Sequence, residues 1–159
     1  MGSESEENLV IGTDFDNQSF PVQHTCDGAN ISPVIHIDRI HAPYLAIIVE
    51  DQIGPDYIFN HWLIWNIPAR PEIPADIPRD PVLTKPFSAV QGKNDAGTIG
   101  YTGPCPPKKG EVHTYYFNVY GLDAELAVRP GATREQLGKA MEGHMVQYGG
   151  QAIAYYERL

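Results

Sequence analysis

The chain has 159 residues, of which 42% are hydrophobic and 19% charged, and its formal net charge is −9 at pH 7. This length fits one globular domain, which can bury a core without needing a disulfide or a metal. The acidic balance argues against non-specific binding to nucleic acid or to an acidic membrane surface.

The first residues are polar and acidic, so we expect a disordered tail at residues 1–8 and a single domain at residues 9–159. No apolar run approaches the roughly 18 to 20 residues of a membrane span, and no signal peptide is visible. We therefore expect a soluble protein of the cytoplasm.

The two cysteines, Cys26 and Cys105, are expected to be thiols in such a reducing compartment. Neither belongs to a CxxC pair, so the sequence gives no sign of a structural zinc site. A disulfide would require their Cα atoms to lie within roughly 7 Å, and the sequence leaves open whether they approach.

Short β-rich runs punctuated by turn residues predict a mainly β fold. The strongest strand candidates are residues 45–50, 61–67, 113–122 and 151–156, with weaker candidates at 9–12 and 34–37. The run at 61–67 is almost entirely apolar, which is typical of a central strand buried on both faces.

Six prolines lie between residues 68 and 86. Because proline cannot donate to a β-ladder, this stretch is expected to be an extended irregular crossing within the domain.

One helix is predicted to begin at Thr133, where TREQ has the pattern of a capping box. Apolar residues and His144 follow at helical spacing. The glycines at 149 and 150 are expected to end this helix.

The strand candidate at 113–122 begins with two polar residues on one face. Because side chains two positions apart share a face of a strand, His113 and Tyr115 lie together, and Phe117 and Val119 continue that face inward. This order indicates the mouth and wall of a pocket. The alternative is a histidine at the sheet edge and a tyrosine whose ring is simply buried.

A second polar pair, Asp51 and His61, flanks the loop between two strand candidates. If these strands form a hairpin, the carboxylate and the imidazole meet at the same end of the sheet. The carboxylate would then orient the ring and favour its charged form. The alternative is an aspartate that faces water and a histidine in the core.

The loop before His113 is stiff, since YTGPCPPKKG (residues 101–110) contains three prolines. Gly103 permits a close approach of the backbone. Prolines carry no N–H, so the amide of Cys105 is one of the few donors that this loop can present. A rigid loop with one such donor beside a histidine and a tyrosine suits a small oxyanion. The two lysines that follow are most simply explained as solvated.

The stretch YTGPCPPKKGEVHTYYFNVYGLD (residues 101–123) resembles the signature of the phosphatidylethanolamine-binding proteins, also called Raf kinase inhibitor proteins. It is most similar to the prokaryotic YbhB/YbcL-like branch. Four further stretches match this branch in the same order: TCDGANISP (25–33), NHWLIWNIPA (60–69), NDAGTIGY (94–101) and GATREQLGKAMEGH (131–144). The chain departs from the family pattern Asp-Pro-Asp-x-Pro at DQIGP (51–55), where Ile53 replaces the second aspartate.

The resemblance implies a central antiparallel sheet packed with a smaller sheet, and few short helices. It also implies a site for phosphate, acetate or a phosphoethanolamine headgroup, with no metal and no cofactor. Members of the branch often form homodimers, so we expect a homodimer here. Carried over by position, the implied ligand-binding residues are Asp51, His61, Cys105, Pro106, Pro107, His113 and Tyr115.

Three functions follow from these observations. The first is binding of a small anion or phosphorylated headgroup. No catalysis is expected with it, since no Ser or Cys lies in a nucleophile-elbow pattern. The family resemblance implies that such binding regulates a kinase or protease. The second is a protein-interaction module, such as a serine protease inhibitor, that acts through residues 68–86. The third, a metal-dependent hydrolase, has six histidines in its favour but no HxH or HExxH spacing.

Overall fold

The computed structural model describes residues 8–149 and 151–159. The tail expected at residues 1–8 lies outside the described residues, except for residue 8. In chain order the elements are β1 (Val10–Gly12), the 3₁₀ helix η1 (Val22–His24), β2 (Ile35–Asp38), β3 (Tyr44–Gln52), β4 (Ile58–Pro68), β5 (Glu72–Ile73), β6 (Val82–Leu83), β7 (Ala89–Gln91), β8 (Val112–Leu122), α2 (Arg134–Met141), β9 (Met145–Tyr148) and β10 (Ala152–Glu157).

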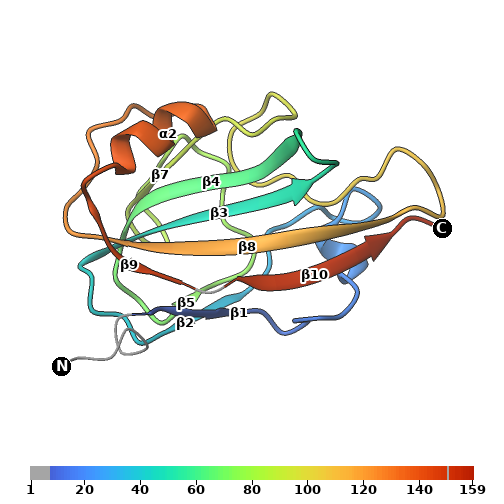
Figure 1. The fold of residues 1–159 in the computed structure, drawn as a ribbon, viewed down its shortest axis with the longest axis horizontal. Helices are drawn as coiled ribbons and strands as arrows, with labels where there is room; N and C mark the ends of the chain where they lie inside the picture. The colour runs from blue at the N-terminus through green and yellow to red at the C-terminus, as the bar shows by residue number, and fades with distance from the viewer. Residues whose placement is uncertain (1–7, 150) are drawn as a thin grey trace.

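These strands form two antiparallel sheets (Figure 1). The larger sheet has the order β10-β8-β3-β4-β7-β6, and β9 pairs with β8 as well; the smaller sheet has the order β1-β2-β5. The mainly β fold with a large and a small sheet, predicted above, is therefore confirmed.

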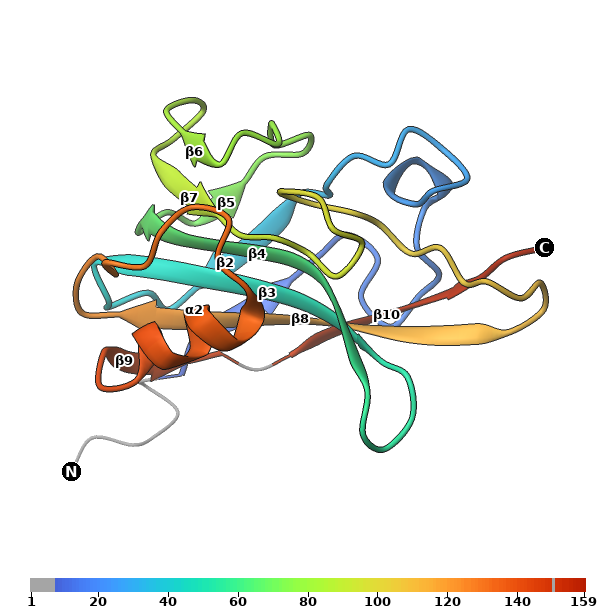
Figure 2. The same cartoon turned by 90° about the horizontal axis from the view of Figure 1, so that it is seen from above.

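The large sheet is covered on both faces, by the small sheet on one side and by α2 on the other (Figures 1 and 2). On β3, Ile47 and Val49 belong to the core shared with the small sheet, whereas Ala46 and Ile48 belong to the core under α2. This alternation follows from the two-residue period of a strand. It explains why β4 is apolar on both faces, as its sequence predicted.

The predicted helix begins where expected but ends early. Thr133 caps it, and the reciprocal hydrogen bonds of a capping box join Thr133 and Gln136. The helix stops at Met141, since Glu142 leaves the helical conformation with a ψ of 130° and Gly143 has a φ of 79°. Residues 145–148, which were expected to be helical, form strand β9 instead. Within the described residues, no helix is both long and apolar enough to cross a bilayer.

The proline-rich crossing is irregular, as predicted, apart from the two-residue strands β5 and β6. The side-chain amide of Gln91 fixes it to the sheet by donating to the carbonyl oxygens of Pro78 at 2.7 Å and Asp80 at 2.9 Å. The crossing thus belongs to the domain and covers one edge of the large sheet.

Candidate functional site

A cavity of about 310 Å³ opens where the ends of β3, β4 and β8 meet the stiff loop. The structure brings together in its lining all the residues that the sequence analysis named as ligand-binding. The lining comprises Asp51, Ile53, Tyr57, Phe59, His61, Ala96, Thr102, Gly103, Cys105, Pro106, Pro107, His113 and Tyr115.

The strand register explains this meeting. β3 lies between β4 and β8, and Asp51 pairs with Phe59 on one side and with Tyr115 on the other. His61 and His113 are each two positions from these partners, so both lie diagonally across from Asp51, within reach of its side chain. The predicted hairpin of β3 and β4 is confirmed, and its connecting loop extends beyond the sheet (Figure 2).

His61 is buried and is fixed by the stiff loop. Its Nδ1 lies 2.7 Å from the carbonyl oxygen of Thr102, and the Thr102 N–H donates back to the His61 carbonyl at 3.0 Å. Burial lowers the pKa of His61, despite the opposing effects of the Thr102 hydrogen bond and of nearby carboxylates. The ring is therefore neutral near pH 7, donates through Nδ1 and carries a lone pair on Nε2. No described residue forms a hydrogen bond with this Nε2.

His113 has the opposite environment. Its Nδ1 lies 2.7 Å from Asp51 and its Nε2 lies 2.9 Å from Glu111. Burial would lower the pKa of His113, but the hydrogen bonds and charges of the two carboxylates outweigh it and raise this pKa. Because each ring nitrogen faces a carboxylate oxygen, the imidazolium form can donate to both partners, and the raised pKa favours that form. The expected pairing of Asp51 with His61 is wrong, because Asp51 orients His113.

Tyr115 lies between the two histidines and is only 1% exposed. Its ring meets His61 edge to face at a centroid distance of 5.3 Å and stacks on His113 at 6.3 Å. Burial, and next the charge of Asp51, raise the pKa of its hydroxyl, which therefore remains a donor at neutral pH. In the described part of the chain, no residue forms a hydrogen bond with this hydroxyl.

The stiff loop is anchored to the segment that follows η1. The N–H of Gly103 donates to Asn30 Oδ1 at 2.7 Å, and the N–H of Cys26 donates to the Pro104 carbonyl at 3.1 Å. A Cβ at Gly103 would lie 2.0 Å from the carbonyl oxygen of His24, which confirms the close approach predicted for this glycine. The N–H of Cys105 donates to no residue that the structure describes.

The prediction of two thiols is wrong, because Cys26 and Cys105 form a disulfide with Cα atoms 5.4 Å apart. The bond joins the pocket loop to the segment after η1, 79 positions earlier in the chain. The hydrogen bond between Cys26 and Pro104 holds the two segments side by side, and this places the sulfur atoms within bonding distance. Sequence spacing could not reveal this, since the approach depends on the tertiary fold.

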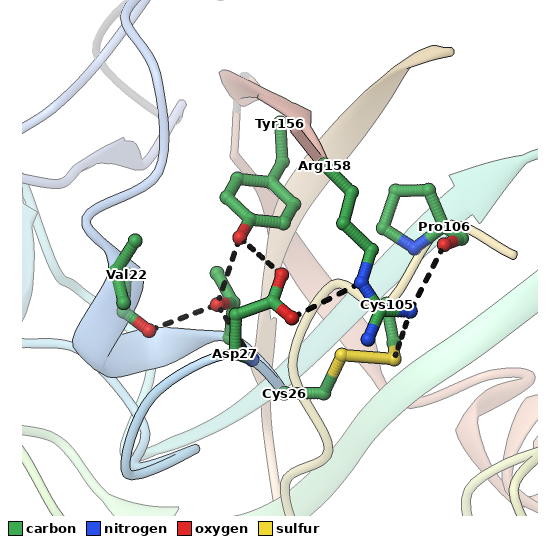
Figure 3. Close-up of polar contacts among 8 residues, drawn as sticks. Val22, Cys26, Asp27, Cys105, Pro106, Tyr156 and Arg158 are labelled. Atoms are coloured by element: carbon green, nitrogen blue, oxygen red, sulfur yellow. Dashed lines mark hydrogen bonds and ion pairs between the residues drawn. A yellow bond between two sulfur atoms is a disulfide. The ribbon is translucent and has the colours of Figure 1, made fainter. Parts of the chain in front are cut away.

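A polar cluster from β10 and the C-terminal end supports the disulfide (Figure 3). The Tyr156 hydroxyl donates to Asp27 at 2.5 Å, and Arg158 pairs with the same carboxylate at 3.0 Å. Arg158 also donates to the Cys105 sulfur at 3.7 Å and to the Pro106 carbonyl at 3.4 Å. Arg158, just after β10, therefore helps to fix the loop that forms one wall of the cavity.

Sequence reasoning missed several lining residues and Glu111. Phe59 and Glu111 each lie two positions before a candidate histidine, so strand alternation could have placed them on the same face. Thr102, Ala96 and Tyr57 had no such signal, because they lie in loops whose course depends on the whole fold.

Among the described residues, no group of three or more His, Cys, Asp or Glu side chains is arranged to hold a metal ion.

Comparison with known proteins agrees with this geometry. The family model for phosphatidylethanolamine-binding proteins matches residues 12–156. A UPF0098 protein of Pyrococcus abyssi is 47% identical over 161 aligned positions, which cover 99% of this chain and 90% of that relative. A second UPF0098 protein, from Methanothermobacter thermautotrophicus, is 42% identical over 142 positions, covering 87% of this chain and 91% of the relative. The chain belongs to the phosphatidylethanolamine-binding protein family.

Solved structures show the same fold. A crystal structure from Chlamydia trachomatis, described as a homolog of phosphatidylethanolamine-binding proteins, superposes with a TM-score of 0.83 at 31% identity. YbcL of E. coli, described as a member of the mammalian family, also has a TM-score of 0.83, at 25% identity. Each comparison covers 96% of this chain and 99% of the other.

Proposed function

We propose that this protein binds small oxyanions, including phosphorylated headgroups such as phosphoethanolamine, and that it does so without chemical turnover. The observation that carries the proposal is the presence, around one cavity, of three polar groups with no described hydrogen-bond partner. These are Nε2 of His61, the hydroxyl of Tyr115 and the N–H of Cys105.

These groups suit an oxyanion in different ways. The Tyr115 hydroxyl and the Cys105 N–H are donors as they stand. Nε2 of His61 becomes a donor only when it gains a proton, taken either from the solvent or from the anion itself. Binding of an anion that brings no proton of its own, such as sulfate, is therefore coupled to the uptake of a proton from solvent. The apolar side chains of Ile53 and Phe59 in the cavity lining suit the carbon portion of an ester.

Calorimetric titration with inorganic phosphate, phosphoethanolamine and ethanolamine tests this proposal. Phosphate and phosphoethanolamine should bind, whereas ethanolamine, which lacks the anion, should not. Equal binding of phosphate and phosphoethanolamine would assign the affinity to the phosphoryl group alone. The proposal fails if neither phosphorylated compound binds at millimolar concentration.

Binding without turnover is supported by the state of Cys105. Cys105 lines the cavity, but its sulfur is held in the disulfide, so it is not a free nucleophile. Incubation with the chromogenic substrates p-nitrophenyl phosphate and bis-p-nitrophenyl phosphate should release no nitrophenol above the buffer rate. Release that disappears in His61→Ala would contradict this part of the proposal.

Regulation of a kinase or protease is a second candidate role, which family membership favours. The proline-rich crossing at residues 68–86 offers a surface for it, since Val82 is exposed and the segment is held rigidly by Gln91. Inhibition of one member of a panel of serine proteases would support this role.

A homodimer remains a prediction, which light scattering at high protein concentration checks.

We also propose that the protein works in the cytoplasm. The disulfide must then persist in the cytoplasm, where thiol systems usually keep cysteines reduced. Cell fractionation combined with alkylation of free thiols before lysis tests both points. We expect to find the protein in the cytoplasmic fraction, with Cys26 and Cys105 unmodified by the alkylating reagent because they form the disulfide.

A further inference from the structure

His113 lies between two carboxylates that differ in mobility. The Asp51 side chain is 4% exposed and contacts Nδ1, whereas the Glu111 side chain is 47% exposed and contacts Nε2. Asp51 is therefore a fixed partner, because breaking its contact would leave a buried charge unpaired. Glu111 can exchange His113 for water at small cost, because half of its side chain is already solvated.

These two contacts use both N–H donors of the ring. An imidazolium has no third donor, so a ligand oxygen gains Nε2–H only if Glu111 gives it up. The Glu111 carboxylate is itself an oxyanion, and it competes with ligands of the same chemistry from within the same chain. Because the competition is intramolecular, the carboxylate acts at a high effective concentration.

Glu111 also determines the charge of the site. The carboxylates of Asp51 and Glu111 both contact the single ring of His113, while burial lowers the pKa of His61. Acidic groups therefore outnumber basic ones here, which gives this end of the cavity a negative charge. Such a charge opposes a dianion more strongly than a monoanion.

There is also space for Glu111 to move. A second cavity of about 470 Å³ is lined by Glu111, Gln52 and Thr114, and it shares Asp51 and His113 with the first. Glu111 lines this second cavity and not the first, so its carboxylate can turn away from His113 within that space while His113 stays in place.

We propose that Glu111 is a specificity-determining residue of the pocket: its carboxylate occupies Nε2 of His113 as an internal counter-anion, which an oxyanion must displace to use this donor. The residue thereby selects monoanions, such as phosphodiesters, over dianions. This inference rests on the proposed anion binding and adds a ligand preference to it.

The test compares the parent with Glu111→Gln and with Asp56→Asn, a matched control that removes the same charge from the exposed β3–β4 loop. The probes are inorganic sulfate, a dianion, and methyl sulfate, a monoanion, in calorimetric titrations at pH 7. Glu111→Gln should raise sulfate affinity about tenfold, the worth of one charge-assisted hydrogen bond, and should raise methyl sulfate affinity less. Asp56→Asn should change either affinity by less than about twofold.

A second measurement needs no ligand. Glu111 is one of two carboxylates that raise the pKa of His113, so this pKa should fall in Glu111→Gln, as read from the ¹⁵N shifts of the ring. An unchanged pKa would overturn the proposal, because the contact would then not exist in solution.

The titrations separate the remaining outcomes. Equal sulfate affinity in parent and Glu111→Gln, or an equal gain in Asp56→Asn, overturns the role of Glu111 and leaves anion binding intact. If sulfate and methyl sulfate bind none of the three proteins, the proposed function itself fails, and the role of Glu111 fails with it.

Discussion

The two histidines of the cavity differ in what they can offer a ligand. Nε2 of His61 has no partner among the described residues, whereas both ring nitrogens of His113 are engaged by carboxylates. His61→Ala should therefore weaken phosphate binding about tenfold, since it removes a donor that is charged once the proton is taken up. Tyr115→Phe removes a neutral donor and should cost about two- to tenfold. Calorimetric titration of the single variants checks this order.

Lys108→Ala is the control for these variants, because this exposed side chain lies on the same loop but contributes only a screened charge. It should change phosphate affinity by less than about twofold. A loss in Lys108→Ala as large as that in His61→Ala would mean that general electrostatics, and not the pocket, accounts for binding.

The coupling to a proton gives binding a definite pH dependence. Folding lowers the pKa of His61, so the ring is neutral above this pKa and must gain a proton to donate to an anion. Sulfate affinity should therefore rise as pH falls from 8 towards 5, by up to about tenfold per unit for one coupled proton. Sulfate keeps its charge over this range, so the slope reports on the protein.

The charges of Asp51 and Asp95 raise the pKa of His61 and the charge of His113 lowers it, although burial has the largest effect. The slope should persist in Glu111→Gln and flatten in His61→Gln. A slope that survives in His61→Gln would assign the proton to another group.

Glu111 illustrates what sequence reasoning can find at the residue scale. Its position two residues before His113 was visible, and strand alternation places both on one face. The sequence could not predict which histidine Asp51 contacts. The strand β3 pairs with both β4 and β8, and the two histidines are equally near to Asp51 in the register.

At the scale of elements, the stiff loop depends on the close packing of Gly103. A Cβ there would lie 2.0 Å from the backbone oxygen of His24, so Gly103→Ala forces the loop and the segment after η1 apart. We expect a loss of about 1 to 3 kcal/mol in the free energy of unfolding, together with weaker phosphate binding. Urea denaturation and titration measure the two effects.

Gly138→Ala is the matched control. Its Cβ would meet only the end of the Arg134 side chain, which can move, and alanine favours the interior of α2. This variant should be as stable as the parent or more stable. Equal destabilisation by both substitutions would contradict the role assigned to Gly103.

The disulfide is the second device that fixes the loop. It closes a long segment of chain, and native disulfides typically contribute about 2 to 4 kcal/mol to the free energy of unfolding. Cys26→Ser/Cys105→Ser should lose stability of this order in urea. Phosphate binding should weaken as well, because the wall that presents the Cys105 N–H becomes less ordered. Unchanged affinity in the double variant would show that the loop's hydrogen bonds suffice to position it.

The C-terminal half of the predicted helix shows the limit of periodicity. Residues 137–144 have helical spacing, but Gly143 adopts a positive φ and the chain turns there into β9. A short strand with exposed Met145 and Val146 has no distinctive pattern, and it exists because β8 offers an unpaired edge. The two-residue strands β5 and β6 were not predicted either, because they are too short to show a periodic pattern.

At the scale of the whole molecule, the long strands could be predicted and their connections could not. β3, β4 and β8 are apolar over long runs, and together with the motif at residues 101–123 they identified both the fold and the place of the cavity. The disulfide and the partners of each histidine depend on contacts between segments that are distant in the chain, for which one sequence carries no periodic signal.

The most direct test of the account is a phosphate titration of the parent and of His61→Ala/His113→Ala, with circular dichroism to confirm that both are folded. The double substitution removes the His61 ring, which donates to an anion once protonated, and the His113 ring, which lies between Asp51 and Glu111, so phosphate binding should fall by more than tenfold. Phosphate affinity in the folded double variant equal to that of the parent would contradict the assignment of this cavity as the binding site.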